Sequence, residues 1–357
     1  MRSKVFYVRV SEQDSEEIIR QKFARLLAVC NIAEGVKKGE KAVIKMHFGE
    51  EGNTGYVKPE YVRVLSDILS RNCAKVLVSD TNTLYKGRRT RSEDHVKLAR
   101  EHGFTFENTG AEVFVPEDSS ETTVRIEVDQ EFVKTAKVAG IFLDAGILIN
   151  LAHFKGHIMT GFGGALKNIG MGCASREGKM EQHTDISPTV FLDKCTGCGA
   201  CGEVCPVAAI EINEGKASLD SERCIGCASC IAACPTEAMA MDWPRGGDTI
   251  QQKMMEYVKA VLDNRKGKSV HINFALKITK ECDCLAKDDP RLVPDVGIFV
   301  SRDPVSIDKA CLDLAISNAG GVDIFRQAHP GVDAMKQLLY AARLGLGNLE
   351  YDLVEIK

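Results

Sequence analysis

The chain has 357 residues, of which 44% are hydrophobic and 27% are charged, and its formal net charge is −4. These values are typical of a globular protein of about two domains, and the small net charge gives no general attraction to nucleic acid or to an anionic membrane. The first residues show neither the apolar core of a signal peptide nor a twin-arginine pair. The longest apolar stretch, 138–152, is interrupted by Asp144. We therefore expect a cytoplasmic protein with no membrane or nucleic-acid partner, and its oligomeric state is left open.

Strand and helix patterns succeed one another along the first half of the chain. Alternating hydrophobicity predicts strands, and apolar residues at helical spacing predict helices. We expect strands over Lys4–Val10, Lys41–Phe48, Lys75–Ser79 and Ile141–Leu151, and helices over Ser15–Cys30, from Pro59 onward and over His95–His102. Such a succession implies βαβ units and a mainly parallel sheet.

The same pattern returns near the C-terminus. We expect strands over 270–278, Val296–Val300 and Asp352–Ile356, and helices from Asp303 onward and over Val332–Leu344. The prediction is an α/β fold in which residues 1–186 plus 247–357 form one discontinuous domain with a mainly parallel sheet. Residues 187–246 are then an inserted α+β domain of the bacterial ferredoxin type, which ends at a linker near 243–247.

Eight cysteines carry the strongest signal, because they form two copies of the spacing C-x2-C-x2-C-x3-C followed by proline. The two runs are Cys195, Cys198, Cys201 and Cys205, and Cys224, Cys227, Cys230 and Cys234. In two-cluster ferredoxins the fourth cysteine of each run ligates the cluster of the other run. We therefore expect two [4Fe–4S] clusters, the first completed by Cys234 and the second by Cys205. Two complete copies of the spacing argue against the alternative, zinc.

A glycine-rich segment follows the apolar strand Ile141–Leu151 and leads into a helix. Ligands of open α/β sheets bind beyond the carboxyl ends of strands, and the start of a helix attracts anions. We expect the lysines and glycines of this segment to bind an anionic substrate or cofactor: Lys155, Lys167, Gly161, Gly163 and Gly164. A structural turn with solvated lysines is the alternative reading of the same residues.

A second charged segment, Asp80–Arg89, follows the strand Lys75–Ser79. Arg88 and Arg89 are suited to bidentate recognition of a carboxylate or phosphate. The alternative is an exposed basic loop.

Cys282 and Cys284 are separated by one residue. In an extended segment such residues point to the same side, so both thiols are expected to reach one metal ion or one partner sulfur. The residues that would complete a third metal site are His153, His157, His183 and Cys173. The alternative is a pair of small core residues.

Four segments together resemble the family named for domain of unknown function 362, in its form with an inserted two-cluster ferredoxin. They are DTNTLYKGRR at Asp80–Arg89, HFKGHIMTGFGGALKNIGMG at His153–Gly172, the CDC triplet at Cys282–Cys284, and SRDPVSIDKA at Ser301–Ala310. The resemblance implies binding of [4Fe–4S] clusters and assigns no reaction. It also implies that the four segments surround one site.

These observations leave three functions open. The first is an oxidoreductase, in which the clusters exchange electrons with a site in the α/β domain and histidines transfer protons near neutral pH. Its catalytic candidates are His157, His183, Lys155 and Lys167. The second is an electron carrier or adaptor that docks a redox partner protein. The third is metal handling or cluster delivery through Cys282 and Cys284.

Overall fold

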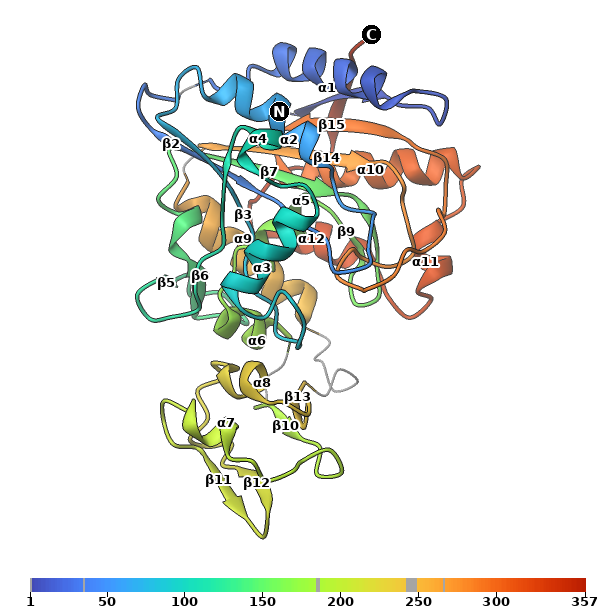
Figure 1. Ribbon diagram of the computed structural model, residues 1–357. Helices are drawn as coiled ribbons and strands as arrows, with labels where there is room; N and C mark the ends of the chain where they lie inside the picture. Colours follow the sequence, from blue (N-terminus) through green and yellow to red (C-terminus); the bar gives the residue numbers. More distant parts are fainter. Residues whose placement is uncertain (1, 35, 184–186, 242–248, 266) are drawn as a thin grey trace.

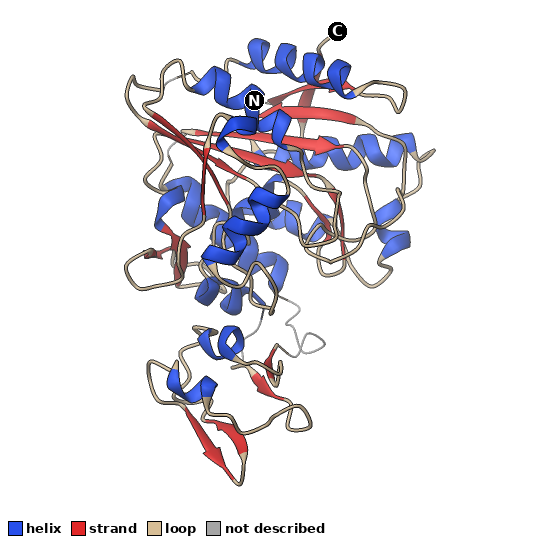
Figure 2. Ribbon diagram, in the orientation of Figure 1, coloured by secondary structure: helices blue, strands red, loops and turns tan. Residues whose placement is uncertain are grey.

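The computed structural model describes residues 2–34, 36–183, 187–241, 249–265 and 267–357. Its larger part is a twisted sheet with helices on both faces, and a smaller part lies below it in Figure 1. We call the smaller part, residues 187–241, the cysteine section. Figure 2 shows that the strands of the cysteine section are short and stand apart from the large sheet.

The large sheet has eight strands in the order β16-β1-β15-β14-β7-β2-β3-β4. They are β1 Ser3–Arg9, β2 Lys41–Lys45, β3 Lys75–Ser79, β4 Glu112–Phe114, β7 Ile147–His153, β14 Ser269–Ala275, β15 Gly297–Ser301 and β16 Tyr351–Glu355. Only β15 runs antiparallel to its neighbours, β1 and β14. The predicted α/β fold with a mainly parallel sheet is therefore confirmed.

Both faces of the sheet are covered, and its central strands β7 and β14 are buried along their whole length. In β7, Ile147 and Ile149 belong to one hydrophobic cluster, whereas Leu148 belongs to the other. The first cluster includes residues of α1 Glu16–Cys30, α2 Pro59–Leu69 and α3 Ser92–Glu101. The second includes residues of α5 Ala165–Gly170, α9 Ile250–Asp263, α10 Pro304–Asn318 and α12 Met335–Arg343. None of the described helices is both long and apolar enough to span a bilayer.

The remaining elements are short. Those beside the large sheet are α4 Phe106–Thr109, β5 Thr123–Glu127, β6 Thr135–Ala139, η1 Gly140–Phe142, β8 Lys155–His157, β9 Gly161–Gly163, α6 Arg176–His183 and α11 Ile324–Ala328. The cysteine section contains β10 Thr189–Val190, α7 Ala200–Glu203, β11 Ile210–Asn213, β12 Lys216–Leu219, α8 Ser229–Ala233 and β13 Met239–Ala240.

In the cysteine section β10 pairs with β13 and β11 with β12. The structure does not describe residues 184–186 and 242–248. The first predicted domain border, 186/187, lies at the edge of the first of these ranges. The second border, 246/247, and the predicted linker near 243–247 lie within the other range.

The strand predicted over Lys41–Phe48 ends at Lys45. Two other predicted strands differ from those observed, and local backbone conformation explains both. The strand predicted over Ile141–Leu151 starts at Ile147, because a 3-10 turn precedes it, in which the Leu143 N–H donates to Gly140 O at 2.9 Å. The strand predicted over 270–278 ends at Ala275, since Lys277 takes a left-handed conformation with a φ of 48°. Cys282 and Cys284 consequently lie in a turn rather than in an extended segment.

Asp303 joins the start of α10 to both ends of the chain. Its carboxylate accepts from Val305 N at 2.9 Å and Ser306 N at 2.8 Å, and also from Ser3 Oγ and Asn348 N. We expect Asp303→Ala to lower the free energy of unfolding by about 2 kcal/mol, at the upper end of the range for a lost helix cap, as measured by urea denaturation.

The matched control is Asp323→Ala at α11, where the carboxylate accepts from Phe325 N and Arg326 N. We expect a smaller loss there, because this cap joins no distant segments. Equal losses for the two variants would contradict the additional role of Asp303.

Candidate functional site

A cavity of about 1220 Å³ lies at the carboxyl ends of the parallel strands β2, β3 and β7. These strands are neighbours, so the segments that follow them meet at one edge of the sheet. Most of the lining comes from 45–57, 80–94, 151–172 and 284–286. Three of the four segments singled out in the sequence therefore meet at this cavity, in the place where open α/β sheets bind ligands.

The fourth segment, Ser301–Ala310, supports the fold instead of lining the cavity. Asp303 caps α10, as described above, and Asp308 accepts from Ala165 N at 2.7 Å and Leu166 N at 2.9 Å. The first N–H groups of α5 are thus taken by a carboxylate of the protein itself. The expectation that this helix start would attract an external anion is therefore wrong.

The glycines before α5 are explained mainly by close packing. Gly163 and Gly164 line the cavity, whereas Gly161 does not. A Cβ on Gly164 would lie 2.4 Å from Asp308 Oδ1, and one on Gly161, where φ is +76°, would lie 2.6 Å from Ala334 Cβ. The three glycines let the backbone approach its own neighbours.

Lysines give the cavity a positive character. Lys45 pairs with Asp80 at 2.9 Å and Lys155 pairs with Asp283 at 3.3 Å. Lys167 lines the cavity, and its ammonium group makes no hydrogen bond or ion pair within the part of the chain that the structure describes. Among the described residues, the cavity therefore offers the unpaired Lys167 ammonium group beside the buried ion pairs of Lys45 and Lys155.

Burial lowers the pKa values of two lysines of the cavity. Burial, together with the charges of Lys155 and Lys45, lowers the pKa of Lys167 to about 7. Burial lowers the pKa of Lys179, whose ammonium donates to the Thr81 hydroxyl and to Ala174 O, to about 8. A bound anion would stabilise the charged form of both groups.

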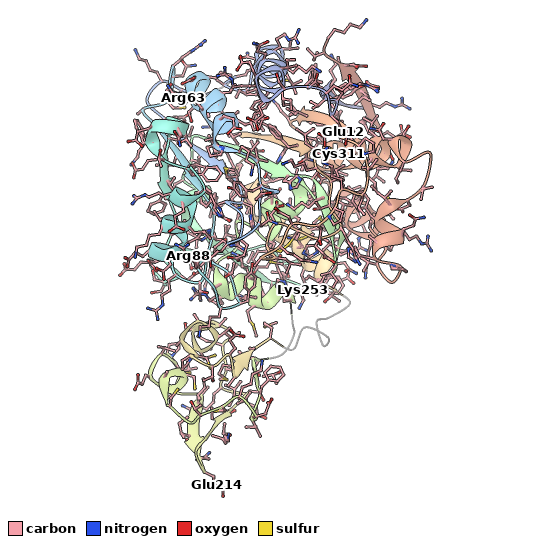
Figure 3. All side chains as sticks on the ribbon, turned by 45° about the vertical axis from the view of Figure 1, so that its right-hand side comes forward. Glu12, Arg63, Arg88, Glu214, Lys253 and Cys311 are labelled. Carbon is pink, nitrogen blue, oxygen red and sulfur yellow. A yellow bond between two sulfur atoms is a disulfide. The ribbon has the colours of Figure 1, made fainter. Side chains whose placement is uncertain are left out.

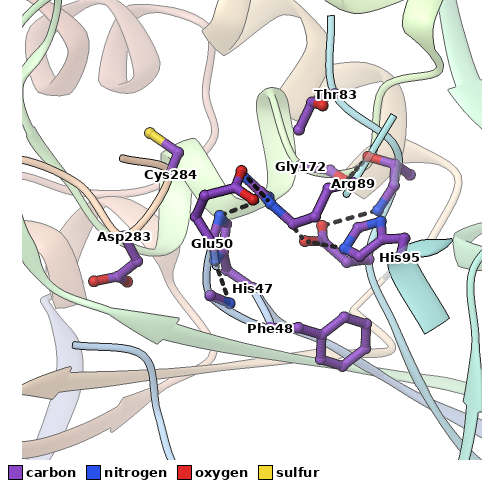
Figure 4. Close-up of polar contacts among 12 residues, drawn as sticks. His47, Phe48, Glu50, Thr83, Arg89, His95, Gly172, Asp283 and Cys284 are labelled. Atoms are coloured by element: carbon purple, nitrogen blue, oxygen red, sulfur yellow. Dashed lines mark hydrogen bonds and ion pairs between the residues drawn. The ribbon is translucent and has the colours of Figure 1, made fainter. Parts of the chain in front are cut away.

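The two arginines predicted to bind an anion form ion pairs and hydrogen bonds with other residues of the protein. Figure 4 shows Arg89 held by Glu50 and His47, at 3.0 Å from Nε and 2.8 Å from Nη1, and Arg89 also donates to the Tyr85 hydroxyl. Arg88, at the surface in Figure 3, pairs with Glu101 and Glu51. Both arginines line the cavity and pair with carboxylates of the protein, so the binding of a ligand by their guanidinium groups stays a prediction.

His157 and His183 both line the cavity, but neither is suited to the proposed proton transfer. Burial, with a smaller effect of Lys167, holds the pKa of His157 well below its usual range. Burial also lowers the pKa of His183 to about 4. Both imidazoles are therefore neutral at pH 7, and Lys167 is the candidate catalytic residue whose pKa lies near neutrality.

Cys282 and Cys284 meet His157 at the cavity wall. The two sulfurs form a disulfide in the structure, and ligand atoms of all three residues lie within 4.8 Å of one another. His153 is engaged elsewhere: its Nδ1 lies 3.0 Å from both Asp283 carboxylate oxygens and its Nε2 lies 2.8 Å from Leu276 O. Of the four residues proposed to complete a metal site, only His157 joins the pair.

The eight cysteines of the cysteine section line two small cavities, four in each. The first is lined by Cys195, Cys198, Cys201 and Cys234, and the second by Cys205, Cys224, Cys227 and Cys230. Backbone N–H groups point at several of these sulfurs, for example Ala209 N to Cys205 Sγ at 3.2 Å. Burial alone would raise the pKa of Cys234, but backbone hydrogen bonds, including one from Met239 N, hold it below its usual range.

The loop Thr83–Arg89 links the cavity to the cysteine section. Tyr85 lines the cavity and donates from its hydroxyl to Cys284 O at 3.0 Å. The next residue, Lys86, donates from Nζ to Pro235 O at 2.6 Å. Leu84 is buried in the same hydrophobic cluster as Cys230. One short loop thus contacts both candidate sites.

Sequence reasoning missed several residues of the cavity, among them Lys45, His47 and Lys179. Lys45 and His47 stand at the carboxyl end of β2, in the same position relative to their strand as the segments that were found after β3 and β7. Their position at the end of a predicted parallel strand could therefore have identified Lys45 and His47 as site residues. Lys179 lies on α6, which no pattern in the sequence assigned to the site.

These features define an α/β protein with a cation-lined cavity at the carboxyl ends of its parallel strands. The model of a family described as Domain of unknown function (DUF362) matches residues 42–313, and the chain belongs to this family. A search of curated proteins finds no match.

Among solved structures, the chain is similar to the lactate racemase apoprotein from Thermoanaerobacterium thermosaccharolyticum, with 13% identity and a TM-score of 0.38. The match covers 77% of this chain and 51% of that one, so the chain spans about half the length of that protein.

Proposed function

We propose that the protein is an iron–sulfur oxidoreductase that binds two [4Fe–4S] clusters in the cysteine section and a small anionic substrate in the cavity. The clusters supply one-electron transfer, and a redox partner protein exchanges electrons with them. The observation that carries the proposal is the loop Thr83–Arg89, whose residues contact both the cavity and the cysteine section.

The lining of the two small cavities supports the clusters. Each cavity combines three cysteines of one run with the last cysteine of the other, as two-cluster ferredoxins do. N–H donors to sulfur, such as Ala217 N to Cys195 Sγ at 3.3 Å, are a means by which proteins adjust cluster potentials.

The charges of the large cavity support an anionic substrate. The unpaired Lys167 ammonium is the group best placed to bind it, and the ion pairs of Lys45 and Lys155 hold their segments around it. With a pKa of about 7, Lys167 is also able to give or accept a proton when electrons are transferred. A pure carrier needs no such polarised cavity, so these charges favour the oxidoreductase over the adaptor.

The test starts from anaerobically purified protein. Its iron and acid-labile sulfide are expected at about eight of each per chain. The protein is then reduced with dithionite, desalted and mixed with small carboxylate and phosphate compounds, while the visible absorbance of the clusters is followed. We expect one class of anion to reoxidise the clusters. If no anion changes either the reoxidation rate or the Tm, the protein is a carrier.

The pKa of Lys167 makes the proposed anion site pH-dependent. Binding of an anion raises this pKa, so affinity is full below pH 7, where the ammonium is already charged, and falls as the pH rises through about 7. With inorganic sulfate, whose charge is constant over this range, the Kd is expected to rise by up to about tenfold per pH unit above neutrality. Calorimetric titration checks this, and an unchanged Kd between pH 6 and pH 9 would contradict it.

A further inference from the structure

We propose that Cys282, Cys284 and His157 bind one thiolate-preferring divalent transition-metal ion at the wall of the large cavity. The site is separate from the eight cysteines of the cysteine section. Its three ligand atoms come from two segments more than a hundred residues apart and lie within 4.8 Å of one another. Ligand atoms around a tetrahedral zinc ion lie about 3.5–3.8 Å apart, so the two sulfurs, which form a disulfide in the structure, must separate to this spacing once they are reduced.

Two sets of contacts hold the ligand segments together. The strand β8, which carries His157, donates from Gly156 N to Thr279 O at 2.8 Å, just before the CDC turn. A Cβ on Gly156 would lie 2.1 Å from Lys280 O, so this approach requires glycine. The juxtaposition of histidine and cysteines is therefore built into the backbone.

Asp283, between the two cysteines, anchors the turn from its other side. Its carboxylate contacts His153 Nδ1 at 3.0 Å and Lys155 Nζ at 3.3 Å, and its carbonyl oxygen accepts from Glu50 N at 3.0 Å. Figure 4 shows Asp283 and Cys284 on the far side of Glu50 from Arg89. The turn is thus fixed on both sides, which pre-organises the two thiols.

The imidazole of His157 is held through one ring nitrogen. Its Nδ1 lies 3.2 Å from Met159 N and 3.1 Å from Thr160 Oγ1, and the Thr160 hydroxyl donates to Phe162 O. Nε2 has no hydrogen-bond partner among the residues that the structure describes. A metal-binding histidine donates the N–H of its other ring nitrogen within the protein, so metal binding at Nε2 requires the ring proton to move to Nδ1. Thr160 Oγ1, at 3.1 Å, is then the acceptor for Nδ1–H, in place of the contact in which Met159 N–H donates to Nδ1.

The site requires the reduced cysteines. A phosphine reductant converts the disulfide to two thiols: it breaks the S–S bond, takes oxygen from water as phosphine oxide, and leaves one proton on each sulfur. The metal ion then displaces the thiol protons. We therefore expect binding to the reduced protein and none to the disulfide form.

Three protein ligands leave one position of a four-coordinate ion open, the pattern of catalytic zinc sites. Cys284 and His157 both line the cavity, so the ion is accessible to a ligand bound there. This role toward an anion rests on the proposed function, whereas the metal site itself rests only on its three residues.

The experiment uses the full-length protein, purified without oxygen and treated with the phosphine. It is loaded with Zn²⁺ and desalted, and its zinc, iron and sulfide are measured. We expect about one zinc per chain, and X-ray absorption with two sulfurs at about 2.3 Å and one nitrogen at about 2.0 Å. The Cys282→Ser/Cys284→Ser variant is expected to retain its iron and lose the zinc, and His157→Ala to lose the nitrogen shell.

The matched control is Cys30→Ser, a half-buried cysteine of α1 outside the cavity lining, which should bind zinc normally. Equal zinc in the wild type and the double variant would overturn the proposal, as would a wild type that binds none after reduction. The iron and sulfide contents and the response to anions, measured on the same samples, report separately on the proposed function.

Discussion

A Cys195→Ala/Cys234→Ala variant is expected to keep about half of the wild-type iron, whereas Cys195→Ala/Cys205→Ala is expected to lose nearly all of it. In the first variant both substitutions fall in one small cavity, so the other keeps its four thiolates. In the second variant each cavity loses one ligand. Iron and sulfide analysis, with electron paramagnetic resonance of the reduced protein, checks this.

The two double variants distinguish two arrangements: clusters whose cysteine ligands come from both runs, and clusters whose ligands all come from one run. If each run held its own cluster, Cys195→Ala/Cys205→Ala would be the variant that keeps half of the iron, and the result would be reversed. Cys30→Ala is the control, because this half-buried cysteine lies on α1, away from both small cavities. Full iron in every variant would exclude these cysteines as ligands.

Lys167→Ala is expected to weaken the binding of the anionic ligand by about 10- to 100-fold, the effect of losing a charged hydrogen bond of about 1.5–3 kcal/mol. The same change should abolish turnover and leave the cluster spectra intact. Because the ammonium has no carboxylate partner in the described structure, its removal should not lower the Tm of the ligand-free protein. Calorimetric titration and thermal unfolding measure the two effects.

The control for this variant is Lys309→Ala, which removes a partly buried lysine that pairs with Asp313 on α10 and lies outside the cavity lining. It should leave anion binding unchanged. Lys167→Arg keeps the positive charge and should recover part of the affinity. Wild-type binding and turnover in Lys167→Ala would remove this lysine from the site.

The sheet was predictable where burial follows a local pattern. The strand Lys75–Ser79 was predicted with its observed bounds, because apolar residues on both faces of a central strand are visible in the sequence. The strand over 270–278 was predicted too long, since the left-handed conformation of Lys277 has no signal in its side chain. The helix at Asp303 was predicted from its cap and its first-turn proline, both of which are local.

The charged residues of the site were found, but their partners were not. Arg88 and Arg89 occur beside each other in the sequence, yet their carboxylate partners are remote along the chain. Glu101 and Glu50 form ion pairs with the two guanidinium groups, and ligand binding by Arg88 and Arg89 stays a prediction. The unpaired ammonium group belongs instead to Lys167, which, unlike Lys155, has no carboxylate within ion-pair distance in the described structure.

The sequence by itself determined the family, the α/β succession and the grouping of eight cysteines into two runs, because each depends on residue types at short spacings. Only the tertiary structure decided which cations remain unpaired, that His157 and His183 are neutral at pH 7, and that His157 reaches Cys282 and Cys284. These properties depend on burial and on contacts between residues far apart along the chain. The energy of a buried charge is set by the atoms around it, and the order of residues along the chain does not specify those atoms.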